Sequence, residues 1–261
     1  MRVLRGSTVR EAYEFTKNSL EFSEQCIASL IKAIQNKKYV VSKNFITVTP
    51  MWTPEAVRIY KHVLRSGRNT IGLPKVVFEF PPHIGGNNLI AFYHPYRNLL
   101  WVCVQENVPP LDRDCFIEGL SSNHFYMGLL KHEATHYLDA LRWTDREKKH
   151  KALSTKVRQI HSDNIENSLG NSLEYLRYYF NTEQEVQAYF SDVIRRLASM
   201  YTSQKQKLTM SIVVNTFEKE EFWLYLTDSQ KRRILKAAYV FFNKLWGLFE
   251  SPKKKGRPYV R

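Results

Sequence analysis

Two histidines and a glutamate stand close enough in the sequence to act on one metal ion and one water molecule. His132 and His136 are four residues apart, so on a helix they project from the same face, one turn after the other. Two imidazoles in this arrangement can bind one zinc ion and leave room for a third ligand and a water. Glu133 follows the first histidine directly and could accept a proton from that water. The spacing therefore predicts a zinc site with a general base beside it.

The segment that carries these three residues has the apolar periodicity of a helix. Apolar residues recur in it at helical spacing, namely Tyr126, Leu129, Leu130, Ala134, Tyr137, Leu138 and Leu141. Ser121, Ser122 and Asn123 precede the segment and offer N-caps. The pattern His-Glu-x-x-His on a helix is that of zinc peptidases. The alternative is an amphipathic helix whose polar face carries two histidines and a glutamate by coincidence.

Asp139 strengthens the interpretation as a zinc site. It falls one helical turn beyond His136, where a carboxylate can accept the N–H of the ligand's other ring nitrogen and fix its tautomer. The alternative for Asp139 is an ordinary exposed acid that faces Arg142 or Trp143.

The composition is that of a globular protein. The chain has 261 residues, of which 43% are hydrophobic and 25% charged, and it is long enough to bury a sizeable core. The sequence contains no run of about 18 apolar residues, so no membrane span is predicted. The N-terminus lacks the apolar core of a secretory signal. The three cysteines are odd in number and widely spaced, which favours a reducing compartment over a disulfide framework. We expect a cytoplasmic protein, either intracellular or associated with a virion.

The formal net charge is +14, which would draw the surface weakly to polyanions such as nucleic acid, acidic protein or lipid headgroups. The charge is spread along the chain, apart from the clusters at Lys148–Lys151 and Lys253–Arg257. The sequence contains none of the usual nucleic-acid-binding motifs. A solvated, solubilising surface is the favoured interpretation.

Before the zinc helix, the sequence predicts two helices and three strands. Apolar residues recur at helical spacing from Thr8 to about Lys37, and Thr53-Pro54 begins a second helix that runs to about Arg65. The predicted strands are Lys75–Phe80, Leu89–Tyr93 and Leu99–Gln105. His94–Asn98 joins the last two strands as a hairpin.

After the zinc helix, most of the chain is predicted to be helical. Residues 145–161 are strongly basic and expected to be exposed, and residues 172–180 are rich in aromatic side chains. A helix begins at Thr182. Further helices are predicted at Ser203–Phe217, Lys219–Leu226 and Asp228–Phe249, followed by a loose basic tail from Lys253 to Arg261.

Three short segments resemble those of gluzincin-type zinc peptidases, in the same order along the chain. The segment Ala91–Leu100 is similar to the edge-strand hairpin before the zinc helix in the neprilysin family. The segment His132–Asp139 is similar to that family's extended zinc motif, and Glu185–Ala188 to the motif of its third zinc ligand. The resemblance covers about 22 of the 261 residues, so it indicates a distant and compact gluzincin and not membership of the neprilysin family.

The resemblance implies an α+β, zincin-like fold with a small mixed or antiparallel sheet packed on a long active-site helix. It implies that Zn²⁺ is bound by His132, His136 and Glu185, with Asp139 behind a histidine and Glu133 as the general base. A peptide or protein substrate would lie along the edge strand at Ala91, Phe92 and Tyr93. We expect an N-terminal helix in residues 1–45, a catalytic core in 46–200, a helical part in 201–250 and a basic tail in 251–261.

The sequence departs from the neprilysin pattern at two positions. Ile90 stands where that family has an asparagine that helps to hold the substrate, and Tyr189 stands where it has an aspartate after the third-ligand motif. The third ligand also has alternatives. Glu185 is favoured because Ala188 lies on the same helical side and allows close approach, but His161 and Glu183 are ligand types that zinc also accepts.

The leading functional hypothesis is an intracellular zinc metallopeptidase. A first alternative is a zincin-fold structural or binding protein that keeps zinc for stability, as in a virion or a toxin–antitoxin pair. A second alternative is a nucleic-acid-associated protein that uses its basic surface.

Overall fold

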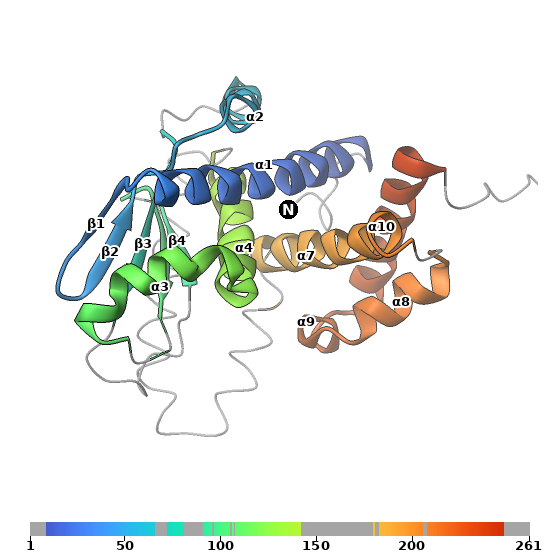
Figure 1. Cartoon of the computed structure of the whole chain (residues 1–261). Coiled ribbons are helices and arrows are strands. Elements are labelled where there is room, and N and C mark those ends of the chain that lie inside the picture. The colour runs from blue at the N-terminus through green and yellow to red at the C-terminus, as the bar shows by residue number, and fades with distance from the viewer. Residues whose placement is uncertain are drawn as a thin grey trace, which may run out of the picture.

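The computed structural model describes residues 9–65, 72–80, 91–95, 97–104, 106, 108–141, 180, 183–205 and 208–247 (Figure 1). The predictions for residues 145–161, for residues 172–179 and for the tail at 251–261 lie outside the described residues. His161, one of the alternative zinc ligands, is among them.

A five-stranded mixed sheet forms one end of the molecule (Figure 1). Its strands are β1 (Tyr39–Val41), β2 (Phe45–Val48), β3 (Lys75–Glu79), β4 (Ala91–His94) and β5 (Leu99–Cys103). They lie in the order β1-β2-β3-β5-β4, in which β3 and β5 are parallel and the other pairs antiparallel. Strand β4 is therefore at an edge of the described sheet, with β5 as its neighbour.

The three predicted strands are present as β3, β4 and β5, whereas β1 and β2 were not predicted. The two additional strands have only three and four residues, too few for alternation of apolar and polar residues to give a signal. A short helix that was also not predicted, α3 (Arg113–Gly119), contacts their turn. The buried guanidinium of Arg113 donates to the carbonyl of Ser42 at 2.8 Å. The hairpin thus depends on a residue distant in the sequence.

One face of the sheet packs on two long helices, α1 (Val9–Gln35) and α4 (His124–Ala140). Alternate residues of the central strands point to this side and are completely buried, as the pleat of a strand requires. They are Ile46, Val48, Val76, Phe78, Leu100 and Val102. Helix α4 contacts β4 and β5, and α2 (Pro54–Arg65) packs on α1. This core places the edge strand β4 directly beside α4.

Four helices form the other end of the molecule (Figure 1). They are α7 (Glu183–Thr202), α8 (Met210–Glu218), α9 (Glu221–Leu224) and α10 (Asp228–Trp246). A second apolar cluster joins them, and Tyr13 and Leu20 of α1 pack against it. Helix α1 thus contributes to both ends of the molecule.

Two predicted helix boundaries in this region were wrong. The helix expected from Ser203 begins at Met210, because Thr209 caps it by accepting from the amide of Ile212 at 3.3 Å. Helix α10 ends at Trp246 and not at Phe249, because Gly247 takes the left-handed conformation (φ 61°) that terminates helices. The predicted start of α10 at Asp228 is confirmed, and the structure adds that Thr227 and Gln230 form a capping box there.

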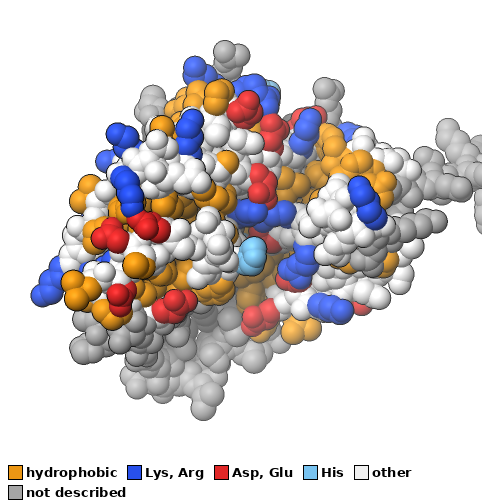
Figure 2. Space-filling model, in the orientation of Figure 1, with side chains coloured by type: hydrophobic (Ala, Val, Ile, Leu, Met, Phe, Trp, Pro, Cys, Tyr) orange, Lys and Arg blue, Asp and Glu red, His pale blue; other side chains and the backbone are white. Residues whose placement is uncertain are grey.

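The chain is a mixed α+β structure with a small sheet and mostly helical content. None of the helices in the described ranges has a stretch that is long and apolar enough to cross a membrane. On the face in Figure 2, Lys and Arg side chains alternate with Asp and Glu and do not form one continuous basic patch.

Candidate metal centre

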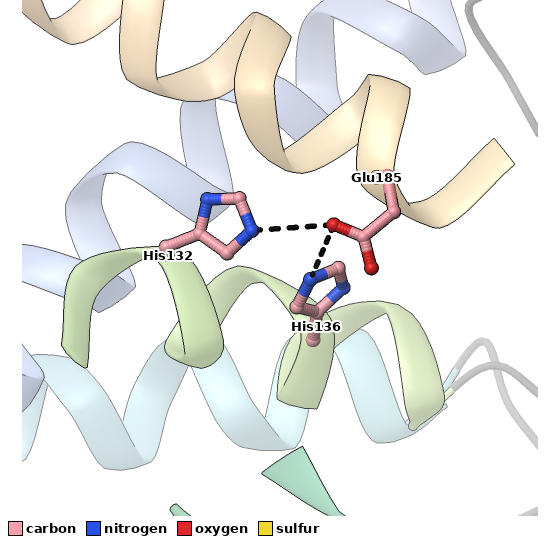
Figure 3. Close-up of side chains that lie close together, drawn as sticks. All are labelled: His132, His136 and Glu185. Atoms are coloured by element: carbon pink, nitrogen blue, oxygen red, sulfur yellow. Dashed lines mark ion pairs between the residues drawn. The ribbon is translucent and has the colours of Figure 1, made fainter. Parts of the chain in front are cut away.

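The helix that carries the two histidines forms as the sequence predicts. Asn123 caps α4 by accepting from the amide of Tyr126 at 3.3 Å. On one side of the helix, Tyr126, Leu130, Tyr137 and Leu138 are fully buried in the core with the sheet. The side chains of His132 and His136 therefore project from α4 toward Glu185 on α7, which crosses it (Figure 3).

Helix α7 supplies the carboxylates that face α4. Glu185 and Asp192 are seven residues apart, which places them two turns apart on one helical face. Val186, Phe190 and Val193 lie on another face of the helix and are buried in the C-terminal cluster. The apolar face of α7 thus fixes the direction in which its acids point.

The carboxylate of Glu185 lies between the two imidazoles (Figure 3). Its Oε2 is 3.5 Å from Nε2 of His132 and 3.6 Å from Nε2 of His136. One ligand atom from each of the three residues lies within 4.8 Å of the others. The structure therefore brings the three predicted ligands together from two helices that are separate in the sequence.

These distances fit a tetrahedral ion. Ligand atoms at about 2.1 Å from a tetrahedral zinc ion stand about 3.4 Å from one another. The two distances from Glu185 to the imidazoles are close to this value and too long for ordinary hydrogen bonds. Two histidines and one carboxylate, with a position left for water, are a donor set typical of catalytic zinc.

Burial and charge set the protonation of the three ligand side chains. Burial tends to raise the pKa of Glu185, but His136 and His132 outweigh it and hold that pKa well below its usual range. Burial likewise tends to lower the pKa of His132, but Asp192 and Glu185 raise it well above the usual value of 6.5. The pKa of His136 is raised against burial by Glu185 and Glu133. The acidic neighbours thus favour positive charge at the two imidazoles.

Glu133 is buried beside the ligands, with 6% of its surface exposed. Burial raises the pKa of its carboxyl above the usual value, although the neighbouring His136 and His132 lower it in part. The backbone of Tyr93 on β4 also approaches this carboxylate through a hydrogen bond that lowers its pKa. Glu133 thus stands between the histidines and the edge strand.

Asp192 is a site residue that the sequence reasoning missed. Its Oδ2 is 2.7 Å from Nδ1 of His132, the ring nitrogen that faces away from Glu185. Tyr189 stands at the position where the neprilysin family has an aspartate, and its ring packs edge-on against His132 with centroids 4.9 Å apart. The seven-residue spacing from Glu185 to Asp192 was the signal that could have identified this carboxylate.

The predicted roles of Asp139, of the edge strand and of Glu183 stay predictions. Asp139 is half-buried on α4 one turn beyond His136, and its pairing with His136 is not tested. Ala91, Phe92 and Tyr93 lie on the edge strand β4, as expected, but no contact with a substrate is shown. Glu183 begins α7, and its side chain lies outside the described residues.

Comparison with known proteins finds no family model, no curated protein and no solved structure that matches this chain. The functional assignment therefore rests on the residues and geometry of the site.

Proposed function

We propose that this protein is a zinc-dependent peptidase whose site is built by α4 and α7. The observation that carries the proposal is the position of Glu185 Oε2, 3.5 and 3.6 Å from the Nε2 atoms of the two histidines. His132, His136 and Glu185 would hold the ion. Zinc, when bound, supplies a Lewis acid that activates water and polarises the scissile carbonyl.

Glu133 acts as the proton carrier in this proposal. It is not one of the proposed ligands, but it follows His132 directly on the same helix and is buried in the site. Its raised pKa suits a group that must accept a proton and release it again near neutral pH, because proton transfer is most efficient when the pKa is near the working pH. Glu133 would take the proton of the attacking water and pass it to the leaving amine.

The edge strand β4 offers a place for the peptide. It pairs with β5 on one side, and its position at the end of the described sheet leaves the other side for a further strand. A peptide in extended conformation can add to such an edge through main-chain hydrogen bonds. Because the backbone of Tyr93 is near the Glu133 carboxylate, a peptide on β4 would lie beside the catalytic base.

The arrangement also supports a zincin-like fold. A mixed sheet with an edge strand beside the helix that carries both histidines, and a later helix that supplies the third ligand, is the arrangement that the resemblance to gluzincins implies. Here β4 lies beside α4, and α7 follows α4 in the sequence and crosses it. The proposed class is therefore a compact gluzincin.

The experiment is a digest of a complex peptide mixture by the zinc-loaded protein, analysed by mass spectrometry. We expect new cleavage products from the wild-type chain, and their loss in Glu133→Gln by about 10²–10⁴-fold while zinc stays bound. Glu118→Gln, at a half-exposed position on α3, is the matched control and should cleave like the wild type. Cleavage at the full rate by Glu133→Gln would contradict the assigned mechanism. A zinc-loaded protein that cleaves nothing would favour a structural role for the metal.

A further inference from the structure

A chain of polar contacts extends from the metal centre to the N-terminal helix. Asp192 uses one carboxylate oxygen for His132, and its other oxygen, Oδ1, is 2.6 Å from a terminal nitrogen of Arg195. Arg195 lies one turn further along α7, and 19% of its side chain is exposed. Arg195 thus contacts Asp192 on the side away from His132.

Helix α1 fixes this guanidinium from the other side. The second terminal nitrogen of Arg195 donates to the hydroxyl of Ser23 at 2.9 Å, and Ser23 is completely buried. The Nε of Arg195 is 3.5 Å from Oε1 of Glu24. The two terminal nitrogens of the guanidinium are therefore hydrogen-bonded to two different helices, while Nε has, among the described residues, only the longer ion pair with Glu24 and no hydrogen-bond partner. A planar fork that reaches several partners at once is particular to arginine.

The contacts return to the helix that carries the histidines. The same oxygen of Glu24 is 2.7 Å from Nζ of Lys131, the residue before His132. A line of side-chain contacts thus runs over α4, α7 and α1 and closes through the backbone between the adjacent residues Lys131 and His132. Its members are His132, Asp192, Arg195, Glu24 and Lys131. Because His132 and Lys131 are adjacent, a shift of any one of these helices would disturb the orientation of the imidazole.

We propose that Arg195 is a positioning residue of the zinc site, which holds Asp192 against His132 and makes helix α1 part of the metal-binding apparatus. The inference rests on the zinc site proposed above but not on peptidase activity. Partners behind a metal-binding histidine fix its orientation, and their loss typically weakens metal affinity by about 10–100-fold. The contacts of the guanidinium that the structure describes are with Asp192, Ser23 and Glu24, and of these only Asp192 touches a proposed ligand, so its effect on the ion would pass through Asp192.

The test is a double-mutant cycle on zinc affinity, measured by competition with a chelator at constant pH. Arg195→Ala should weaken zinc binding by roughly tenfold in the wild-type background. In the Asp192→Asn background it should change the affinity by less than about twofold, because its partner has already been altered. An Arg195→Ala loss of equal size in both backgrounds would show a general structural role and overturn the proposal, as would no loss in either.

The neighbouring arginine is a matched control. Arg196 pairs with Glu220 on the outer side of α7, 2.7 Å away, and Arg196→Ala removes the same charge without touching the line of side-chain contacts. It should leave zinc affinity within about twofold of the wild type. The visible absorption of the cobalt-loaded protein, which depends on ligand geometry, should change in Arg195→Ala and stay constant in Arg196→Ala.

The test also covers a variant that does not fold and a protein that binds no zinc. If Arg195→Ala does not fold, as judged by circular dichroism, Arg195→Lys takes its place in the cycle, because it keeps the positive charge but cannot bind Asp192, Ser23 and Glu24 together. An Arg195→Lys protein with unchanged zinc affinity and cobalt spectrum would overturn the proposal. Wild-type protein that binds no zinc would overturn both this inference and the proposed function. Zinc binding that is insensitive to Arg195 overturns the inference alone.

Discussion

The crossing of α1, α4 and α7 and the C-terminal cluster of α8–α10 bury very different side chains. Most of the buried polar residues in the described part of the chain lie on the three crossing helices, namely Thr16, Ser19, Ser23, Ser29, Glu133, Thr135, Glu185, Gln187 and Ser191. In the described part of α8–α10, the buried residues are all hydrophobic. A buried polar group destabilises a fold unless it has a partner. The contrast supports our proposal that the crossing holds the functional site and that the cluster is its scaffold.

Helix α7 joins the two regions and belongs to both. Glu185 and Asp192 face the crossing, while Phe190 and Val193 face the apolar cluster. Substitutions on the two sides of this helix should therefore have separable effects on zinc affinity and on folding stability. The predictions that follow test this separation.

The largest expected effect is the removal of a zinc ligand. His132→Ala, His136→Ala or Glu185→Ala should each weaken zinc binding by more than the roughly 100-fold upper range seen for outer partners. Glu183→Ala, two residues earlier on α7, is the control and should retain zinc. Chelator competition measures all four variants. Stronger loss in Glu183→Ala than in Glu185→Ala would mean that the third ligand has been misassigned.

The second prediction concerns the scaffold. Phe242 is completely buried among aromatic neighbours that include Phe241 and Trp246. Phe242→Ala should lower the free energy of unfolding by about 3–5 kcal/mol through the cavity that it leaves. The zinc affinity of the folded protein should not change. Urea unfolding and chelator competition on the same preparation check the two halves of this prediction, and a parallel loss of zinc would erase the contrast between the regions.

A third prediction is the pH dependence of zinc binding. Zinc must displace the protons of His132 and His136, whose pKa values lie above the usual 6.5 because of their buried acidic neighbours. The affinity should therefore rise with pH beyond 6.5, by up to about tenfold per pH unit for each displaced proton, and level off above the raised pKa values. An affinity that is constant above pH 6.5 would contradict the raised pKa of these histidines.

The same pKa shifts predict the stability of the metal-free protein. A histidine whose pKa is higher in the folded than in the unfolded state stabilises the fold while it is protonated. This stabilisation is fully present below about pH 6.5 and is lost as the pH rises through the raised pKa of His132. Metal-free protein should thus lose stability over this window in thermal melts, while the stabilisation by added zinc should grow.

The smallest expected effect is within the polar crossing itself. The hydroxyl of Ser19 on α1 donates to that of Thr135 on α4 at 2.9 Å, and both residues are buried. Ser19→Ala should lower the free energy of unfolding by about 1 kcal/mol. In the Ser19→Ala background, Thr135→Val should lower the free energy of unfolding by less than it does in the wild type, because the two hydroxyls are each other's partners. Fully additive losses in urea unfolding would show that this bond contributes little.

The sequence was informative where one helix carries the signal. The mixed α+β character and the helix with His132 and His136 are confirmed, and of the three predicted N-caps, Ser121, Ser122 and Asn123, the structure uses Asn123. The zincin-like fold stays a prediction. The convergence of Glu185 on the histidines agreed with a motif-based expectation. The spacing from Glu185 could place Asp192 on the same face of its helix, but not its contact with His132, which spans 60 residues of chain and depends on how the two helices pack.

The most direct test of the central claim is elemental analysis of protein that has been purified without chelators and dialysed against zinc. The account predicts one zinc per chain in the wild type and much less than one in His132→Ala and in Glu185→Ala. X-ray absorption of the loaded wild type should show nitrogen and oxygen ligands. A wild-type chain that holds no zinc, or the same zinc content in wild type and both variants, would contradict the assignment of this crossing as a zinc site.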